Sequence, residues 1–466
     1  MSETVAVVLA AGMGTRMKSE IPKVLHRVAG RPLVAWVVQA AFDAGVDRCV
    51  VVVGHAKEQV ESELRERFGD KVAFAEQTEQ KGTGHATACA LPALEGHQGH
   101  VLVLYGDCPL IPSDILREVI EKTGNAPLAL VTATIEQPAG YGRIIRTKGG
   151  VTAIREDRDC SPAEKTIHEV NPGVYCIEVG FLREAVALLS DDNDQGELYL
   201  TDLVATAAGR SEVPWVEGDM HTLRGVNDRW ELAQVGEAMR LRINETLARD
   251  GVGLVDPATT FIDADCELEA DATIMPGVHL RGRCSIAAGA TVDVGSVLED
   301  VKVEAGATVL PYTVATDARI GPVATVGPFS HLRPKTDLGE GSKVGNFSET
   351  KKTTLGKGSK VNHLAYVGDG QIGEGVNIGA GVIFCNYDGV QKHTTVLEDG
   401  VFIGSDSQLV APLTVGKGAY VASGSTVTKD VPADALAVSR TRQSNKEGYA
   451  SRLRSRFQAA KKSAEE

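Results

Sequence analysis

The sequence predicts two different folds in one chain, an α/β domain followed by a left-handed parallel β-helix built from hexapeptide repeats. Three observations lead to this prediction. β-Branched runs alternate with helical patterns in the first half, and aliphatic residues recur at every sixth position in the second. Glycine reaches 50 of 466 residues, above the usual share of about 7%, which indicates many tight turns.

The first half carries the pattern of a mainly parallel sheet covered by helices. Strand-like runs at Val5–Leu9, Arg48–Val53, Val101–Leu104 and Leu128–Thr134 are separated by Ala-rich or charged amphipathic stretches. We place this domain at residues 1–229. Because ligands of such sheets bind beyond the carboxyl ends of the strands, the residues that follow the first and third runs are the first candidates for a site.

A linker helix is expected at residues 230–250. Apolar residues fall at helical spacing from Trp230 onward, and few helix breakers interrupt them. The β-helix and a C-terminal tail then occupy residues 251–466. The end of this tail, residues 449–462, is basic and is expected to form a short helix or a mobile segment.

The six-residue period of the second half is neither the 3.6 of a helix nor the 2 of a strand. Its natural meaning is a solenoid of triangular coils, in which each side contributes one aliphatic residue to a central column. Such solenoids wind left-handed, an exception to the usual crossover rule. An irregular glycine-rich β-protein is the alternative. The residues expected in the column are Ile262, Leu268, Ile274, Leu280, Ile286, Val292, Leu298, Val314, Ile320, Val326, Leu332, Leu338, Val344, Leu355, Val361, Val367, Ile403, Leu409, Val415, Val421 and Val427.

Composition restricts the partners. A net charge of −14 argues against a general affinity for nucleic acids, which comes from surplus Lys and Arg. The chain has neither a secretory leader pattern nor an apolar run near 18 residues, so we expect a cytoplasmic protein without a membrane partner. The eight cysteines form no CxxC pair, which indicates reduced, packed thiols.

A glycine loop follows the first strand. In the segment Leu9–Met17, glycines allow backbone N–H groups to approach phosphate oxygens, and Arg16 and Lys23 can neutralise charge during phosphoryl transfer. The loop is neither a GxGxxG fingerprint nor a Walker A motif, because Met17 stands at the third glycine position and no GK[ST] is present.

Taken whole, this loop resembles the motif of sugar-1-phosphate nucleotidyltransferases. Gln77 with Lys81–Gly84 is similar to the family's base-recognition segment, and Tyr105-Gly106-Asp107 is similar to its metal-binding strand end. An Asp after an apolar run is well placed to hold Mg²⁺, which prefers one or two carboxylates plus phosphate oxygens. A turn-capping Asp is the alternative.

Four later motifs resemble the uridylyltransferase branch of that family: Gly140–Ile144, Glu156, Val170–Gly173 and Gly225–Asn227. A single Asn in a turn is usually only a turn residue, but here the motifs occur in the family's order. The resemblance implies that Gly142, Glu156 and Asn171 contact the sugar and that Asp107 and Asn227 bind Mg²⁺. It implies a site for UTP and UDP-N-acetylglucosamine at Leu9, Ala10, Ala11, Gly12, Arg16, Lys23, Gln77, Gly82, Thr83, Tyr105, Gly106, Asp107, Gly142, Glu156, Asn171 and Asn227.

The β-helix carries charged residues at places that small residues would fill more easily. Arg333, Lys351 and Lys352 interrupt turns and form a cluster of cations, which favours an anionic substrate. His363 stands on a coil edge, where a lone His is more often structural. The segment Cys385–His393 breaks the six-residue period and is expected to loop out, and such loops often carry function.

Residues 1 to about 447 resemble, almost without interruption, the family of bifunctional N-acetylglucosamine-1-phosphate uridylyltransferase/glucosamine-1-phosphate N-acetyltransferases. The strongest block runs from Leu332-Arg333-Pro334 to Gly404-Ser405-Asp406. The resemblance implies an N-terminal Rossmann-like nucleotidyltransferase domain and a β-helix acetyltransferase domain. His363 would then be the general base that takes a proton from the glucosamine amine as it attacks acetyl-CoA.

The same resemblance assigns the other β-helix residues. Family members carry Ala where this chain has Ser423, so the resemblance leaves open whether residue 423 contacts acetyl-CoA through its backbone only. The tail beyond Gly448 matches the family poorly. The sugar phosphate would be held by Arg333 and Lys351, the sugar positioned by Tyr366, Asn377 and Asn386, and the acetyl-CoA site lined by Ala380, Asn386, Tyr387, Ser405, Ser423 and Arg440.

The resemblance implies two consecutive steps, with acetyl-CoA and UTP as cosubstrates and sugar phosphates as substrates. Acetylation of glucosamine 1-phosphate would come first. The product's phosphate would then displace pyrophosphate from UTP, a reaction that needs alignment and charge neutralisation, which suits Lys23, Arg16 and Mg²⁺. UDP-N-acetylglucosamine is a precursor of peptidoglycan and lipopolysaccharide. β-Helices of this type assemble as trimers, so a homotrimer is expected.

Two alternatives remain open from the sequence. One is a nucleotidyltransferase with a single activity, whose β-helix only trimerises the protein. The other is a non-catalytic scaffold or regulatory binder.

Overall fold

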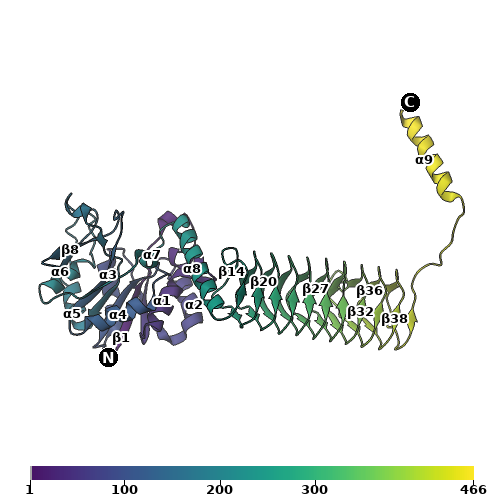
Figure 1. Cartoon of the computed structure of the whole chain (residues 1–466), viewed down its shortest axis with the longest axis horizontal. Coiled ribbons are helices and arrows are strands. Elements are labelled where there is room, and N and C mark those ends of the chain that lie inside the picture. The colour runs from purple at the N-terminus through teal and green to yellow at the C-terminus, as the bar shows by residue number, and fades with distance from the viewer. Residues whose placement is uncertain (1–2, 466) are drawn as a thin grey trace. The chain divides into compact units, whose positions relative to one another are not determined.

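The computed structural model describes residues 3–465 and divides into two compact units (Figure 1). Unit 1 comprises residues 1–246 and 261–265, and unit 2 comprises residues 247–260 and 266–466, as far as they are described. The helix expected at 230–250 is α8 (Arg229–Arg249), which belongs to unit 1 as far as Thr246. Among the described helices, none has the length and apolar character needed to cross a membrane.

Unit 1 is built on a mixed sheet of ten strands, in the order β5-β4-β1-β6-β11-β7-β10-β8-β9, with β12 paired to β7. These strands are β1 (Thr4–Leu9), β4 (Arg48–Val53), β5 (Val72–Glu76), β6 (His100–Tyr105), β7 (Leu128–Thr134), β8 (Arg143–Thr147), β9 (Gly150–Arg155), β10 (Glu169–Val170), β11 (Tyr175–Glu178) and β12 (Trp215–Glu217). A separate pair is formed by β2 (Arg27–Val28) and β3 (Arg31–Pro32).

The four predicted strands all form, and the sheet is parallel from β5 through β4 and β1 to β6. The sequence did not predict that β11 inserts antiparallel between β6 and β7. Strand runs are a local pattern, whereas their order in the sheet depends on contacts far apart in the chain. β1 and β6 pair with Leu9 opposite Tyr105, so the residues after both strands share one edge of the sheet. This edge carries the candidate site.

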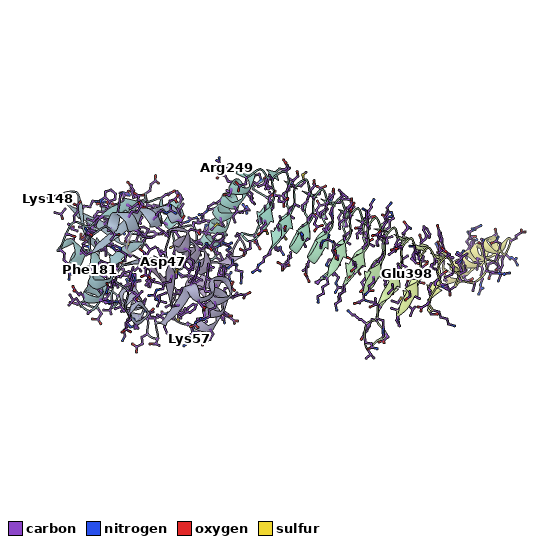
Figure 2. The ribbon with its side chains drawn as sticks, turned by 90° about the horizontal axis from the view of Figure 1, so that it is seen from below. Asp47, Lys57, Lys148, Phe181, Arg249 and Glu398 are labelled. Atoms are coloured by element: carbon purple, nitrogen blue, oxygen red, sulfur yellow. The ribbon has the colours of Figure 1, made fainter. Side chains whose placement is uncertain are left out.

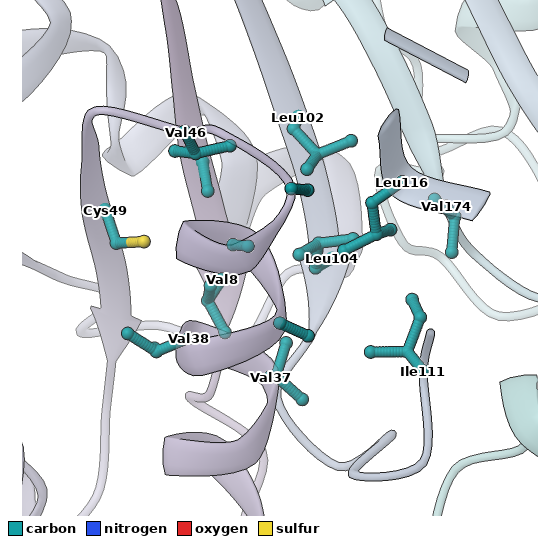
Figure 3. Packing of buried hydrophobic residues seen from close by; sticks show 14 of the residues in the cluster. Val8, Val37, Val38, Val46, Cys49, Leu102, Leu104, Ile111, Leu116 and Val174 are labelled. Atoms are coloured by element: carbon teal, nitrogen blue, oxygen red, sulfur yellow. The ribbon is translucent and has the colours of Figure 1, made fainter. Parts of the chain in front are cut away.

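Helices cover the sheet and bury its apolar faces. They are α1 (Leu33–Asp43), α2 (Lys57–Phe68), α3 (Thr83–Cys89), α4 (Ser113–Thr123), α5 (Val179–Val186), α6 (Asp202–Ala208) and α7 (Met220–Leu223), besides α8. Figure 3 shows Val8 and Leu104 of the central strands beside Val37 and Val38 of α1, all without exposed surface. Burial of the sheet on both faces explains why its central strands are almost continuously apolar.

Unit 2 is a parallel β-helix whose short strands pair with those one coil later (Figure 1). One sheet of eleven strands contains β13 (Gly253–Leu254), β16 (Thr273–Ile274), β19 (Thr291–Val292), β21 (Thr308–Val309), β23 (Thr325–Val326), β26 (Lys343–Val344), β29 (Lys360–Val361), β32 (Asn377–Ile378), β35 (Phe402–Ile403), β38 (Tyr420–Val421) and β40 (Leu436–Ala437).

The remaining strands form a sheet of seventeen that contains β14 (Phe261–Ile262), β15 (Glu267–Leu268), β17 (His279–Arg281), β18 (Ser285–Ile286), β20 (Val297–Val303), β22 (Val314–Ile320), β24 (His331–Leu332), β25 (Thr336–Leu338), β27 (Glu349–Lys351), β28 (Thr354–Leu355), β30 (Tyr366–Gly368), β31 (Gly370–Ile372), β33 (Ile383–Cys385), β34 (Thr395–Leu397), β36 (Gln408–Val410), β37 (Leu413–Val415) and β39 (Thr426–Val427).

The predicted aliphatic column is present and fully buried at nearly every position, as at Ile274, Val326 and Leu409. Two positions differ. Val314 is 41% exposed, because Ala315 rather than Val314 pairs with Leu298 and points inward, and Leu268 is only half-buried. The coil that contains Val314 is shorter by one residue, which moves the interior position along the chain.

The corners of the coils explain the glycine content. Most corners place one residue in the left-handed backbone region, which favours glycine, as at Gly295 and Gly381. Larger residues stand there on several coils: Asp271, Asp300, Tyr312, Asp317, Val323, Phe329, Lys335, Phe347, Lys352, Leu364, Asp369, Asp406 and Asp434. The prediction that these cations interrupt turns is therefore correct for Lys352, whereas Lys351 is the last residue of strand β27.

The segment that breaks the period loops out between β33 and β34, and Tyr387 and Lys392 form an isolated bridge within it. Glu398, labelled in Figure 2, directly follows β34, the strand that comes after this loop. The basic C-terminal segment forms the helix α9 (Tyr449–Glu465). The eight cysteines form no disulfide in this structure.

Candidate active sites

Unit 1 contains a cavity of about 620 Å³ at the edge of the sheet where β1 and β6 end. Every residue predicted for the nucleotide site lines this cavity except Gly106. Gly106 instead donates its backbone N–H to the carbonyl oxygen of Leu9 at 2.9 Å and so joins the two strand ends. Residues from segments far apart in the chain are thus brought together in one place.

Two glycines shape the loop that is predicted to bind phosphate, and Gly12 of this loop lines the cavity. Gly14 has a left-handed backbone, and a Cβ there would lie 2.5 Å from the Cβ of Lys23, so only glycine lets the loop pack against this lysine. A Cβ on Gly12 would meet nothing within 4 Å. The loop therefore leaves open space beside its backbone, as close approach of a phosphate requires.

Each predicted metal-ligating side chain is held by a cation of the same loop region. Lys23 Nζ lies 2.5 Å from Asp107 Oδ2, and Arg16 Nη2 donates to Asn227 Oδ1 at 2.7 Å. A Cβ on Gly225 would lie 3.0 Å from Asp107 Oδ1, so this glycine lets the segment that carries Asn227 run close to the carboxylate.

The donor set fits Mg²⁺. One carboxylate and one amide oxygen face the same cavity, and Mg²⁺ commonly uses few protein oxygens together with phosphate oxygens. Among residues 3–465, no group of three or more His, Cys, Asp or Glu side chains could hold a metal ion.

The other end of the cavity is lined by buried polar groups. Glu156 accepts a hydrogen bond from Thr201 Oγ1 at 3.0 Å, and burial raises the pKa of its carboxyl group. Asn171 donates to the hydroxyl of Tyr175 at 2.6 Å and accepts the backbone N–H of Gly173 at 3.0 Å. The side chain of Asn171 is therefore engaged by the protein on both its amide atoms.

In unit 2, His363 is exposed and its ring is oriented by a neighbour on the preceding coil. Its Nδ1 lies 2.7 Å from Asn346 Oδ1, and the two residues are 17 positions apart. Since an amide oxygen can only accept, Nδ1 carries the proton of the neutral ring and Nε2 has the free lone pair. An exposed imidazole with one unprotonated nitrogen is chemically competent to accept a proton.

The cations predicted to hold a sugar phosphate lie close to one another. Arg333 Nη1 forms an ion pair with Glu349 Oε1 at 2.8 Å. The neighbouring ammonium of Lys392 and, to a smaller extent, the guanidinium of Arg333 lower the pKa of Lys351. A concentration of like charge of this kind favours an anion.

Tyr366 and Asn386 converge above Gly368, where a Cβ would lie 2.6 Å from the Tyr366 hydroxyl and 2.5 Å from Asn386 Nδ2. Asn386 Nδ2 donates to Asp369 Oδ2 at 2.5 Å. Asn377 lies apart from them, in β32 of the other sheet.

Three of the residues predicted to line an acetyl-CoA site, Ala380, Ser405 and Ser423, follow one corner over successive coils. The carbonyl oxygen of Ala380 accepts the N–H of Asp406, next to Ser405, at 2.7 Å. A Cβ on Gly404 would lie 2.7 Å from Ser423 Oγ. Tyr387 lies in the loop, 58% exposed, with its hydroxyl bonded to the Gly389 carbonyl oxygen at 2.6 Å. Arg440 lies in the exposed segment after β40.

Sequence reasoning missed several residues of these sites. Gln80 and Glu231 line the cavity of unit 1, where Glu231 accepts the backbone N–H of Asn227 at 2.6 Å, and so does Tyr141, whose motif was noted without a role for its side chain. In unit 2 it missed Asn346 and the other residues that contact the predicted ones from a neighbouring coil. The coil length was the available signal, because residues one coil apart lie side by side.

Comparisons with known proteins agree with this architecture. Residues 6–193 match the model of the MobA-like NTP transferase domain, and residues 394–429 match that of the hexapeptide repeat of succinyl-transferase. The Bifunctional protein GlmU of Sorangium cellulosum is 53% identical over 98% of this chain and 98% of its own length. This chain belongs to the bifunctional GlmU family. Its GlmU relative from Geobacter metallireducens is 49% identical, over 96% of this chain and 98% of that protein.

Membership of the GlmU family confirms the predicted fold class and the prediction of a bifunctional enzyme. The alternatives of a non-catalytic scaffold and of a single-activity enzyme are therefore disfavoured.

Proposed function

We propose that this GlmU-family enzyme makes UDP-N-acetylglucosamine in two steps, acetylation of glucosamine 1-phosphate in unit 2 and uridylyl transfer in unit 1. The observation that supports this most strongly is the convergence of the predicted nucleotide-site residues on one cavity. The sugar nucleotide would serve the synthesis of peptidoglycan and lipopolysaccharide. The cytoplasm, which supplies UTP and acetyl-CoA, is the proposed compartment.

For uridylyl transfer, the phosphate of N-acetylglucosamine 1-phosphate attacks the α-phosphorus of UTP, and the bond to the β,γ-pyrophosphate breaks. The open space at Gly12 accommodates the phosphates, and Arg16 and Lys23 neutralise the charge that develops on the leaving pyrophosphate. Asp107 and Asn227 would hold Mg²⁺, which supplies further charge neutralisation and alignment when bound. Half-buried Glu156 offers a hydrogen-bond acceptor to the sugar hydroxyls.

For acetyl transfer, the amine of glucosamine 1-phosphate attacks the thioester carbonyl carbon of acetyl-CoA. Nε2 of His363 takes the amine proton, because Asn346 keeps the ring proton on Nδ1. The carbon–sulfur bond then breaks and the CoA thiolate leaves and is protonated. Arg333 and Lys351 hold the phosphate of the acceptor, and the corner formed by Ala380, Ser405 and Ser423 binds acetyl-CoA.

A homotrimer is proposed on the basis of an exposed apolar column. Tyr312, Phe329 and Phe347 stack along one corner, with ring centroids 5.3 and 5.6 Å apart, and each ring is at least half exposed. All three have left-handed backbones, where glycine would be less strained. Large apolar residues at such positions are accounted for by contact with other copies of the chain.

The test is the product mixture formed from glucosamine 1-phosphate, acetyl-CoA, UTP and Mg²⁺. We expect UDP-N-acetylglucosamine, CoA and pyrophosphate. His363→Ala should abolish CoA release and spare uridylyl transfer to N-acetylglucosamine 1-phosphate, whereas Asp107→Asn should do the reverse. Loss of both activities from either change in folded protein would contradict two independent sites.

A further inference from the structure

The loop 386–393 carries predicted site residues but lies outside the strand pairing of the coils. The coil ladder continues from β33 to β36 without it, and the loop has only the single bridge between Tyr387 and Lys392. It also brings the ammonium of Lys392 close to that of Lys351. Repulsion between these like charges pushes the loop outward unless something else holds it.

One carboxylate takes part in three hydrogen bonds inside this loop. Asp388 Oδ1 accepts the backbone N–H groups of Val390 and Gln391, both at 2.8 Å. Its Oδ2 lies 2.7 Å from His393 Nε2. The N–H of His393 in turn donates to the carbonyl oxygen of Asn386 at 2.8 Å, which closes the loop at its base.

The charge of Asp388 strengthens this arrangement. The backbone N–H of Gln391 and then the ring of His393 lower the pKa of Asp388 to about 2. The group is therefore ionised at neutral pH, and hydrogen bonds to an ionised acceptor are shorter and stronger than neutral ones.

We propose that Asp388 is a positioning residue for acetyl transfer, which fixes the loop so that Asn386, Tyr387 and Lys392 meet the acceptor and acetyl-CoA. The inference rests on the proposed acetyltransferase function and extends it to a residue that touches neither substrate. Asp388 holds the loop in one shape before substrate binds. Without Asp388, substrate binding would also have to order the loop, so we expect the substrate affinity to fall.

Steady-state acetyl transfer by the full-length chain tests this role. Asp388→Ala should raise the KM for glucosamine 1-phosphate at least about tenfold and change kcat less than about threefold, because His363 and Asn346 lie on other coils. Asp388→Asn keeps an oxygen for both backbone N–H groups but loses the charge, so its KM should lie between that of the wild type and that of Asp388→Ala. His393→Gln, which retains a donor, should remain close to wild type. Gln391→Ala is the matched control, because it removes an exposed side chain of the same loop and keeps the backbone N–H.

Hydrogen–deuterium exchange of the loop peptide provides a readout that does not depend on activity. The amides of Val390 and Gln391 should exchange faster in Asp388→Ala than in the wild type, and their exchange rates should not change in Gln391→Ala. Unchanged exchange would show that Asp388 does not hold the loop. Faster exchange with an unchanged KM, or a fall in kcat alone, would exclude the positioning role. If the wild-type protein shows no acetyl transfer, the proposed function fails instead, which is a separate outcome.

Discussion

The hydrogen bond between Asn346 and His363 allows us to predict how much acetyl transfer falls when Asn346 is replaced. Asn346→Ala removes the acceptor that lies 2.7 Å from Nδ1, and with it the group that keeps the ring proton on that nitrogen. A neutral hydrogen bond is worth about 0.5–1.5 kcal/mol net, which corresponds to a fall of about 2- to 13-fold in kcat/KM. A mixture of ring tautomers would add to this loss, so the range is a lower bound.

The assay is CoA thiol release with glucosamine 1-phosphate, and uridylyl transfer is measured on the same preparation. Asn346→Asp should retain the acceptor and add a negative charge that stabilises the protonated ring, so the acidic limb of the pH–rate profile should move to higher pH. Unchanged acetyl transfer in Asn346→Ala, or an equal fall in both activities, would refute the assignment of Asn346 as the partner that orients His363.

Two further predictions concern stability. Burial raises the pKa of Glu156, so the folded state holds its proton more tightly than the unfolded state, and this group's contribution to stability falls as pH rises through that raised value. Glu156→Gln should therefore raise the melting temperature of unit 1 more at pH 8 than at pH 4, and lower uridylyl transfer; a larger gain at pH 4 would contradict the sign. Phe384 is 1% exposed in the β-helix, so Phe384→Ala should lower the stability of unit 2 by about 3–5 kcal/mol, seen as one shifted transition in calorimetry, with exposed Val390→Ala as the control.

The fold was largely predictable because both patterns are local. The six-residue period placed the interior residues correctly wherever the coil length stayed constant. It failed at Val314, where the register moves by one and Ala315 takes the interior place opposite Leu298. A shortened coil leaves no mark on the aliphatic period until the next repeat, so the sequence offered two adjacent apolar residues without a reason to choose between them.

The candidate sites depended on the resemblance more than on local pattern. Asn227 meets Arg16 across 211 positions of the chain, and no periodicity connects them. In the β-helix the situation is different, because Asn346 and His363 are 17 residues apart and Arg333 and Glu349 are 16 apart. Polar residues that face outward one coil apart can therefore be paired from the sequence once the local coil length is known.

The loop 386–393 shows why that rule stops at Asp388. Neighbouring coils are bridged at an offset of 17 between Asn386 and Asp369, but at 25 between Glu374 and Asp399, because the second interval contains the loop. The buried column continues past this insertion, since Phe384 and Leu409 pair and are both almost fully buried. The β-helix tolerates the insertion at a corner and holds its base through the bond from Asn386 to Asp369, so the shape of the rest depends on hydrogen bonds within the loop, three of them to the Asp388 carboxylate. A residue selected to hold such a loop need not fit the hexapeptide pattern, and Asp388 could only be identified from its contacts.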